Sequence, residues 1–304
     1  LLDWYFDSLH FLRSADNWGE DFRCELSRGA GRQSLEVELT CLDPARLLAE
    51  RQAGLHAMAA FSATLSPAHW MHDALGLADT AVHRQLASPF SAAQLEVQLA
   101  TGVDTRYRQR RASLPALVAC LGSWLEQVDG NCIVYFPSYA YLQDCLELLE
   151  PRLRQGSREL WVQQRDLGQE ERDELLQRLE RERRLLAICI LGGVFGEGID
   201  LPGERLSAVA VVGVGLPQVN RRTEQLREHY QQRYGAGFEY AYLYPGMQKV
   251  DQALGRVVRR DGDRGAALLV DARYRQRAYR DLLPPWWSYT QWPGEGAGAD
   301  NLTG

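Results

Sequence analysis

Residues 244–260 read Tyr-Pro-Gly-Met-Gln-Lys-Val-Asp-Gln-Ala-Leu-Gly-Arg-Val-Val-Arg-Arg and contain a Q-x-x-G-R-x-x-R pattern. If the stretch is a helix, Gln252, Arg256 and Arg259 share one side, because residues three and four apart are neighbours on a helix surface. Arginine stays charged and presents a planar fork of donors, which suits a phosphate that gains charge in a transition state. The alternative is a solvated basic helix end, since isolated motif matches are often accidental.

Composition describes an ordinary globular chain. Its 304 residues are 45% hydrophobic and 24% charged, enough for one large or two medium domains with a sizeable core. The net charge of −6 does not by itself indicate nucleic-acid binding. Basic residues nevertheless cluster at 106–111 and 256–264, and total charge says little about such local patches.

Two common nucleotide motifs are missing from the sequence. Lys249 is the only lysine, so no Gly-Lys pair and no G-x-x-x-x-G-K-[ST] phosphate loop exists. The only Asp-Glu pair, at residues 173–174, is followed by two leucines, so there is no D-E-x-H box for Mg²⁺. Any nucleotide chemistry must therefore take its main phosphate cradle from another segment.

The six cysteines are widely spaced and form no C-x-x-C pair, which indicates buried thiols in a reducing compartment rather than a metal site. No metal ligands are predicted in this chain. No apolar run approaches the roughly 20 residues of a membrane span, and no signal peptide is visible, so no membrane partner is expected.

Hydrophobic periodicity predicts alternating strands and helices, and therefore a mostly parallel sheet flanked by helices. Residues 14–33 are expected to form a loop or short hairpin, and the aromatic tail after residue 284 to pack on the domain. The chain starts inside a helix-like pattern, as if partway through a longer protein. The expected strands are 35–41 (half-buried), 57–63, 95–99, 132–136, 159–163, 185–191, 206–214, 240–244 and 266–270.

A glycine-rich loop follows the apolar run at 185–191. Four glycines between residues 192 and 198 allow backbone N–H groups to approach a phosphate. Glu197 and Asp200 add carboxylates, which would bind ribose hydroxyls, Mg²⁺ or an arginine. The alternative is a tight strand-to-helix turn with capping acids.

Polar residues also stand at other predicted strand ends. Ser138 is a good helix N-cap, helix N-termini attract phosphates, and Tyr139 could stack on a base. Ser62 and Thr64 offer two hydroxyls at the end of the 57–63 run. Arg106 and Tyr107 begin a basic segment that would follow a nucleic-acid backbone or, alternatively, start a solvated helix.

Four of these motifs occur in a recognisable order: Ser-Ala-Thr-Leu-Ser-Pro at 62–67, Phe-Pro-Ser-Tyr at 136–139, Gly-Glu-Gly-Ile-Asp at 196–200 and Gln-x-x-Gly-Arg-x-x-Arg at 252–259. They resemble helicase motifs III to VI of the XPD/DinG-like branch of superfamily 2, over roughly residues 35–285. The resemblance implies an α/β fold with the RecA-like sheet of a second motor domain. It places the end of an arch or first-motor insertion, expected to be helical, at 1–34, the last strands of the first motor at 35–80, the second motor at 81–285 and a tail at 286–304.

The resemblance also implies roles for single residues. Arg256 and Arg259 would face ATP beside Gln252, while Glu197, Gly198, Asp200 and Gly255 would lie at the nucleotide. Single-stranded or forked DNA would contact a set consisting of Ser62, Thr64, Ser138, Tyr139, Gly196, Arg106 and Tyr107. ATP and Mg²⁺ would serve the complete enzyme, and an iron–sulfur cluster, if present, would belong to the missing N-terminal part.

The leading hypothesis is the C-terminal motor portion of an ATP-dependent DNA helicase, 5′ to 3′ in direction, which is inactive without its own N-terminal motor domain. The expected state is a monomer in the cytoplasm of a bacterial-type cell, associated with the nucleoid. The first alternative is a non-catalytic RecA-like module that binds nucleic acid or protein. The second is a glycine-loop metabolic enzyme with a doubly wound sheet, which gives no reason for residues 62–67 or 252–259.

Overall fold

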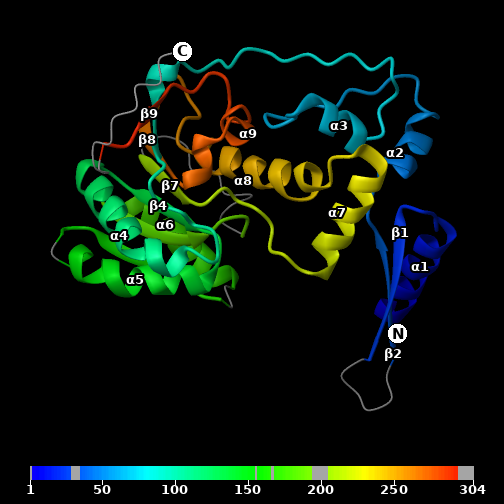
Figure 1. Ribbon diagram of the computed structural model, residues 1–304, viewed down its shortest axis with the longest axis horizontal. Coiled ribbons are helices and arrows are strands. Elements are labelled where there is room, and N and C mark those ends of the chain that lie inside the picture. Colours follow the sequence, from blue (N-terminus) through cyan, green and yellow to red (C-terminus); the bar gives the residue numbers. More distant parts are fainter. Residues whose placement is uncertain (1, 29–34, 155, 166–167, 194–204, 294–304) are drawn as a thin grey trace. The chain divides into compact units, whose positions relative to one another are not determined.

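The computed structural model describes residues 2–28, 35–154, 156–165, 168–193 and 205–293 (Figure 1). The chain forms two compact units. The first unit consists of residues 1–85 and 217–244, and the second consists of residues 86–216 and 245–304. The backbone therefore leaves the second unit after Leu216 and returns to it at Pro245. None of the helices in the described parts of the chain combines the length and apolar character needed to cross a bilayer.

The second unit is built on a parallel sheet of seven strands in the order β5-β6-β4-β7-β8-β3-β9. This arrangement confirms the predicted fold class. The strands are β3 (Leu95–Ala100), β4 (Cys132–Phe136), β5 (Glu159–Val162), β6 (Leu185–Ile190), β7 (Ala208–Val212), β8 (Gly265–Val270) and β9 (Tyr289–Gln291).

Helices cover both faces of this sheet. All residues of β4 and β7 are buried, as expected for parallel strands whose two faces are covered. The helices α4 (Arg110–Gln127) and α5 (Tyr139–Leu153) lie side by side in Figure 1. Leu121 and Trp124 of α4 and Leu142 of α5 belong to the same apolar cluster as Val134 of β4. The helix α6 (Gln169–Arg181) precedes β6, and α8 (Tyr244–Leu254) precedes β8.

Short elements complete the second unit. The 3₁₀ turn η1 (Ala92–Gln94) leads into β3, and η3 (Ala272–Arg275) and α9 (Arg277–Arg280) follow β8. Buried Asn131 ties the start of β4 to its surroundings: its side-chain amide donates to the carbonyl oxygens of Leu179, Glu182 and Arg205 at 2.9–3.0 Å. Its oxygen accepts the N–H of Leu185 at 2.8 Å, which fixes the start of β6 as well.

Two glycines lie against each other where the backbone leaves and re-enters the second unit. A side-chain carbon on Gly246 would lie 2.8 Å from the carbonyl oxygen of Val214 and 3.0 Å from the nitrogen of Leu216. Gly215 has φ +66°, and a side-chain carbon there would lie 2.3 Å from the carbonyl oxygen of Gly246. Both positions therefore need glycine.

The first unit combines helices with a two-stranded antiparallel sheet of β1 (Phe22–Arg28) and β2 (Leu35–Cys41). Its helical segments are α1 (Leu2–Asp16), α2 (Ala45–Gln52), α3 (Ala68–Ala74), α7 (Arg221–Tyr234) and the π-helix η2 (Glu239–Leu243). Aromatic side chains fill its interior. Tyr234 stacks on Tyr240 with ring centroids 5.1 Å apart, and Tyr230 and Trp70 belong to the same group of ring contacts.

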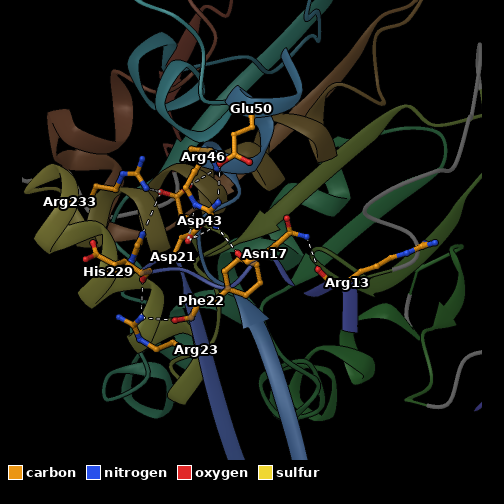
Figure 2. A network of polar contacts seen from close by, with 12 residues as sticks. Arg13, Asn17, Asp21, Phe22, Arg23, Asp43, Arg46, Glu50, His229 and Arg233 are labelled. Carbon is orange, nitrogen blue, oxygen red and sulfur yellow. Dashed lines mark hydrogen bonds and ion pairs between the residues drawn. The ribbon is translucent and has the colours of Figure 1, made fainter. Parts of the chain in front are cut away.

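Charged residues form a polar network in this first unit (Figure 2). The carboxylate of Asp43 is fully buried and lies 3.0 Å from the Arg233 guanidinium and 3.5 Å from His229 Nε2. It also accepts the backbone N–H of Ala45 at 3.0 Å, close to the start of α2. Arg46, the second residue of α2, pairs with Asp21 at 3.1 Å. These contacts join segments that are far apart in the sequence.

Several sequence expectations need correction. Residues 57–63 form no strand: they are exposed, Phe61 at 91%, and no described segment pairs with them. Residues 240–244 were predicted as a strand but are helical. The prediction failed because four consecutive buried side chains give no periodicity that distinguishes a strand from a helix. β2 is a strand but is mostly exposed rather than half-buried. Residues 22–28 form strand β1, which pairs with β2. This agrees with the short hairpin expected within residues 14–33, but not with the helical segment expected at 1–34.

The C-terminal aromatic segment packs on the second unit as predicted, and it also contributes an unpredicted strand. Trp287 and Trp292 are each 6% exposed, and β9 between them pairs with β3. The prediction of buried cysteines holds for four of the six, which are all free, whereas Cys24 is exposed and Cys41 is half-buried. Burial raises the pKa of the Cys132 and Cys145 thiols to about 12.

Candidate nucleotide and nucleic-acid site

Polar groups gather where the parallel strands of the second unit end. Ser138 follows β4, Gln163 follows β5, Gly192 follows β6 and Asp271 follows β8. Since neighbouring parallel strands end on the same side, these residues lie along the carboxyl edge of one sheet. Ligands of open α/β sheets bind outside this edge.

Ser138 caps α5, as its sequence position predicted. Its hydroxyl accepts the N–H of Tyr141 at 3.4 Å, and the Arg110 guanidinium donates to the same hydroxyl at 3.3 Å. The first turn of α5 therefore points its free N–H groups toward the carboxyl edge, where they favour an anion. Its contact with nucleic acid stays a prediction.

Sequence reasoning missed Arg110, which begins α4. Its guanidinium is half-buried, donates to the carbonyl oxygen of Thr105 at 3.0 Å and lies 4.7 Å from the centroid of the Tyr141 ring. Burial lowers the pKa of Arg110 from its ordinary value. The two residues predicted from this segment lie differently: Arg106 pairs with Asp104 at 2.9 Å and Tyr107 is 85% exposed.

Asp271 anchors the ends of β3 and β8. Its buried carboxylate accepts the Thr105 hydroxyl and two hydrogen bonds from the Arg273 guanidinium, at 2.8 and 2.9 Å. Burial alone would lower the pKa of Arg273, but the hydrogen bond and charge of Asp271 outweigh burial and raise it. This ion pair holds Arg273 at the sheet edge.

Tyr139 is held by its neighbours after β5. Its hydroxyl donates to the carbonyl oxygen of Gln164 at 3.1 Å and accepts from Gln163 Nε2 at 2.9 Å. The Arg165 guanidinium lies 5.6 Å from the centroid of the Tyr139 ring. A ring with a cation beside it can stack on bases, as in proteins that bind single strands.

The Q-x-x-G-R-x-x-R pattern does not form one continuous helix. α8 ends at Leu254, and the N–H of Gly255 bonds the carbonyl oxygen of Asp251 at 2.8 Å in the last helical turn. Arg256 and Arg259 therefore lie beyond the helix, and the prediction that Gln252 and both arginines share a helix face is wrong. The glycine ends the helix because it lacks a side chain to pack and has low helix propensity.

Both arginines are nevertheless held in place. Arg256 is 5% exposed. Burial raises the pKa of the Tyr135 phenol in β4, and the charge of Arg256 opposes this rise, because the two side chains are close. Arg259 is half-buried, and its backbone N–H donates to Asp263 Oδ2 at 2.9 Å. Gly255 is exposed, and Gln252 is half-buried. Their action on ATP stays a prediction.

The carboxylate of Asp251 lies in α8 directly before Gln252. Among the described residues, none donates a hydrogen bond to its buried Oδ1. Burial raises the pKa of Asp251 well above its usual range, because a buried carboxylate loses its hydration.

The other predicted residues lie in the first unit or outside the described residues. Gly196, Glu197, Gly198 and Asp200 lie outside the described residues. Ser62 and Thr64 belong to the first unit, where the Thr64 N–H donates to the Ser62 hydroxyl at 3.2 Å in an exposed turn rather than at a strand end.

Comparison with known proteins identifies the class to which this sheet belongs. Among solved structures, one titled XPD helicase superposes with a TM-score of 0.65 at 19% identity, covering 84% of this chain and 46% of that one. A second, titled the structure of S. tokodaii Xpd4, gives a TM-score of 0.58 at 18% identity, covering 85% of this chain and 49% of the other. The fold is that of a RecA-like helicase motor domain.

Sequence comparison then gives the family. The model described as the helicase C-terminal domain matches residues 121–290, more than half of the chain. The chain belongs to the helicase C-terminal domain family. Similar proteins include the ATP-dependent DNA helicase chl1 of Schizosaccharomyces pombe, 26% identical over 62% of this chain and 24% of that protein. The ATP-dependent DNA helicase DinG of Photobacterium profundum is 28% identical over 66% of this chain and 29% of that protein. The chain thus spans about a quarter of the length of these relatives.

Proposed function

We propose that the chain is the C-terminal motor portion of an ATP-dependent DNA helicase that moves 5′ to 3′ on single-stranded DNA. The observation that carries the proposal is the arrangement at the carboxyl edge, where the held ring of Tyr139 accompanies the capped N-terminus of α5. Arg256 and Arg259 follow α8 on the segment that leads to the start of β8, where Gln94 Nε2 donates to the carbonyl oxygens of Arg260 and Asp263. The matched relatives are named ATP-dependent DNA helicases, which supports ATP and DNA as the ligands.

The donor set fits a nucleotide phosphate. Arg256 and Arg259 carry permanent charge, and Asp263 accepts a hydrogen bond from the backbone N–H of Arg259, which fixes this part of the backbone. Guanidinium groups on such a fixed backbone would be suited to stabilise developing negative charge. ATP with Mg²⁺ would supply the energy of phosphoryl transfer when bound. The residues here would orient the nucleotide from one side, because the phosphate loop must come from another motor domain of the same protein.

On this proposal the isolated chain is inactive. The full-length protein, which includes the N-terminal motor domain, works as a monomer in the cytoplasm on nucleoid DNA. Single-stranded or forked DNA would be its partner. An iron–sulfur cluster, if the protein holds one, would lie outside this chain.

The test uses the full-length protein and DNA-stimulated ATP hydrolysis. Arg259→Ala should lower turnover by about 10³- to 10⁵-fold, the effect expected for an arginine that stabilises phosphoryl transfer, while DNA binding stays nearly unchanged. Arg260→Ala is the matched control, because Arg260 is the exposed neighbour in the same turn. Equal turnover in wild type and Arg259→Ala would remove Arg259 from the site. ATP hydrolysis by the isolated chain would contradict the proposed division of the active site.

A further inference from the structure

Lys249, the single lysine of the chain, has no role in the function proposed above. It is half-buried in α8, three residues before Gln252. Its side chain lies across Gly192, directly after β6. A side-chain carbon on Gly192 would lie 3.0 Å from Cδ, 3.1 Å from Cε and 3.3 Å from Nζ of Lys249. The ammonium group is therefore held at the carboxyl edge of the sheet rather than extended into solvent.

The ion pairs of the described residues leave this cation out. Among the residues that the structure describes, no carboxylate forms an ion pair with Lys249. A partly buried ammonium group loses hydration, and it normally recovers this cost from an anion. Most arginines at this edge already have acceptors, as Arg273 has Asp271. Lys249 therefore fits an anion that the described part of the chain does not provide.

Contacts connect Lys249 to the held tyrosine. Gly193, the next residue after Gly192, lies beside Gln163: a side-chain carbon there would lie 3.6 Å from Gln163 Nε2. The same Nε2 donates to the Tyr139 hydroxyl. The Lys249 ammonium group, the Tyr139 ring and the Arg165 guanidinium group thus follow one another along one edge. Gly192, Gly193 and Gln163 connect the lysine to the tyrosine.

We propose that the ammonium group of Lys249 binds a phosphodiester of the single DNA strand whose base stacks on Tyr139. This assignment rests on the proposed function and adds a contact to it. A lysine is a point charge on a flexible stem, which suits a backbone phosphate that is bound without reading sequence. Packing across Gly192 fixes the stem, so the charge stays at the edge before the strand arrives. The two glycines leave room for the strand to come close to the sheet.

The chain allows a direct footprint, because Lys249 is its only ε-amino group. The purified chain is treated with an amine-acetylating reagent with and without oligo(dT), and the acetylated fraction of the Lys249 peptide is measured by mass spectrometry. Oligo(dT) should lower acetylation several-fold, whereas ATP with Mg²⁺ should leave it unchanged. Protection by ATP alone would assign the lysine to a nucleotide phosphate and overturn the proposal. Protection by neither ligand would also overturn it.

Salt dependence supplies the second measurement. Each phosphate contact to a single strand contributes about 0.7 to the slope of log affinity against log salt concentration. Lys249→Gln should therefore reduce this slope by about 0.7, and Lys249→Arg should keep it. Arg154→Gln is the matched control: it removes the same charge at the C-terminal end of α5, where Arg154 forms an exposed ion pair with Glu150.

The outcomes separate the two proposals. If the wild-type chain binds oligo(dT) but Lys249→Gln leaves the slope unchanged, the Lys249 contact is wrong and the proposed function stands. If the wild-type chain shows no binding of oligo(dT) at low salt, the DNA-binding function and the Lys249 contact both fall.

Discussion

The side-chain amide of Gln163 donates a 2.9 Å hydrogen bond to the hydroxyl of Tyr139. The oxygen of the same amide accepts the backbone N–H of Ile190 at 2.9 Å. The position of the Tyr139 ring therefore depends on the ends of both β5 and β6. A ring fixed in this way loses little conformational freedom when a base stacks on it, which favours binding of a single strand.

The Tyr139 ring is predicted to contribute directly to that binding. Tyr139→Ala should weaken oligo(dT) affinity by about 1–3 kcal/mol, the usual effect of removing one base-stacking ring. Fluorescence anisotropy of labelled oligo(dT) at fixed salt measures the change. Tyr139→Phe keeps the ring but loses the hydroxyl bonds that hold it, so it should lose less affinity than Tyr139→Ala. An equal loss in both variants would show that only the hydroxyl contacts contribute and that the ring does not stack on a base.

The buried acid Asp251 is predicted to make folding stability depend on pH. Its folded-state pKa is raised by burial, so the folded state keeps a proton that the unfolded state releases at lower pH. The stability that this proton provides is complete below the unfolded pKa and is lost as pH rises toward the folded pKa. In that range the free energy of unfolding should fall by about 1.4 kcal/mol per pH unit from this group.

Asp251→Asn removes this titration while keeping the size of the side chain. Urea denaturation between about pH 5 and 8, a range in which many proteins are most stable, should show the variant becoming more stable than wild type, with a difference that widens as pH rises. Asp281→Asn, at an exposed position, serves as the control and should give a constant difference. A constant difference for Asp251→Asn as well would mean that Asp251 is ionised in the folded protein.

The fully buried carboxylate of Asp43 is predicted to hold the first unit together. Asp43→Ala leaves Arg233 without its 3.0 Å partner and Ala45 without an acceptor. Arg233 is 39% exposed and can be hydrated, so the expected loss of stability is about 1–3 kcal/mol, the usual cost of leaving a buried donor such as the Ala45 N–H unsatisfied. Hydrogen exchange of α2 and α7 should therefore accelerate strongly, while β4 and β7 of the second unit keep their protection.

The control for this prediction removes a different carboxylate from the same network. Glu50 is exposed and pairs with Arg46 at 3.1 Å, so Glu50→Ala should change stability by at most about 1 kcal/mol. Comparable exchange in the Asp43 and Glu50 variants would contradict the structural importance of the buried carboxylate.

Sequence patterns predicted the second unit better than the first for a physical reason. Continuous apolar runs such as residues 132–136 are buried on both faces, and the predicted strand matches β4 residue for residue. The run at 57–63 is also largely apolar but forms no strand, because a strand depends on hydrogen-bonded neighbours that a local pattern does not specify. Residues 240–244 were misassigned because burial on every side removes the periodicity that separates strand from helix.

The candidate site was predicted in outline but not in detail. The order of the motifs indicated the carboxyl edge and named Ser138 and Tyr139, which do lie there. Arg110 and Gln163 were missed because their importance comes from contacts across 24 to 28 residues of sequence, to Tyr139 and Ser138. A polar residue directly after a buried strand, as Gln163 is, was the available signal. The end of α8 at Leu254 was signalled by Gly255 inside the motif itself.

The close approach of Gly215 and Gly246 has a practical consequence for protein engineering. Because the backbone departs from and rejoins the sheet-bearing unit at neighbouring points, a graft of a few residues can bridge Leu216 to Pro245 without stretching the chain. Such a shortened protein, begun at Leu86, would allow the sheet and its edge to be expressed and studied by themselves. Truncation at Leu86 alone would instead leave Tyr240 of η2 and Tyr244 of α8 without their aromatic neighbours His69 and Trp70 and invite aggregation.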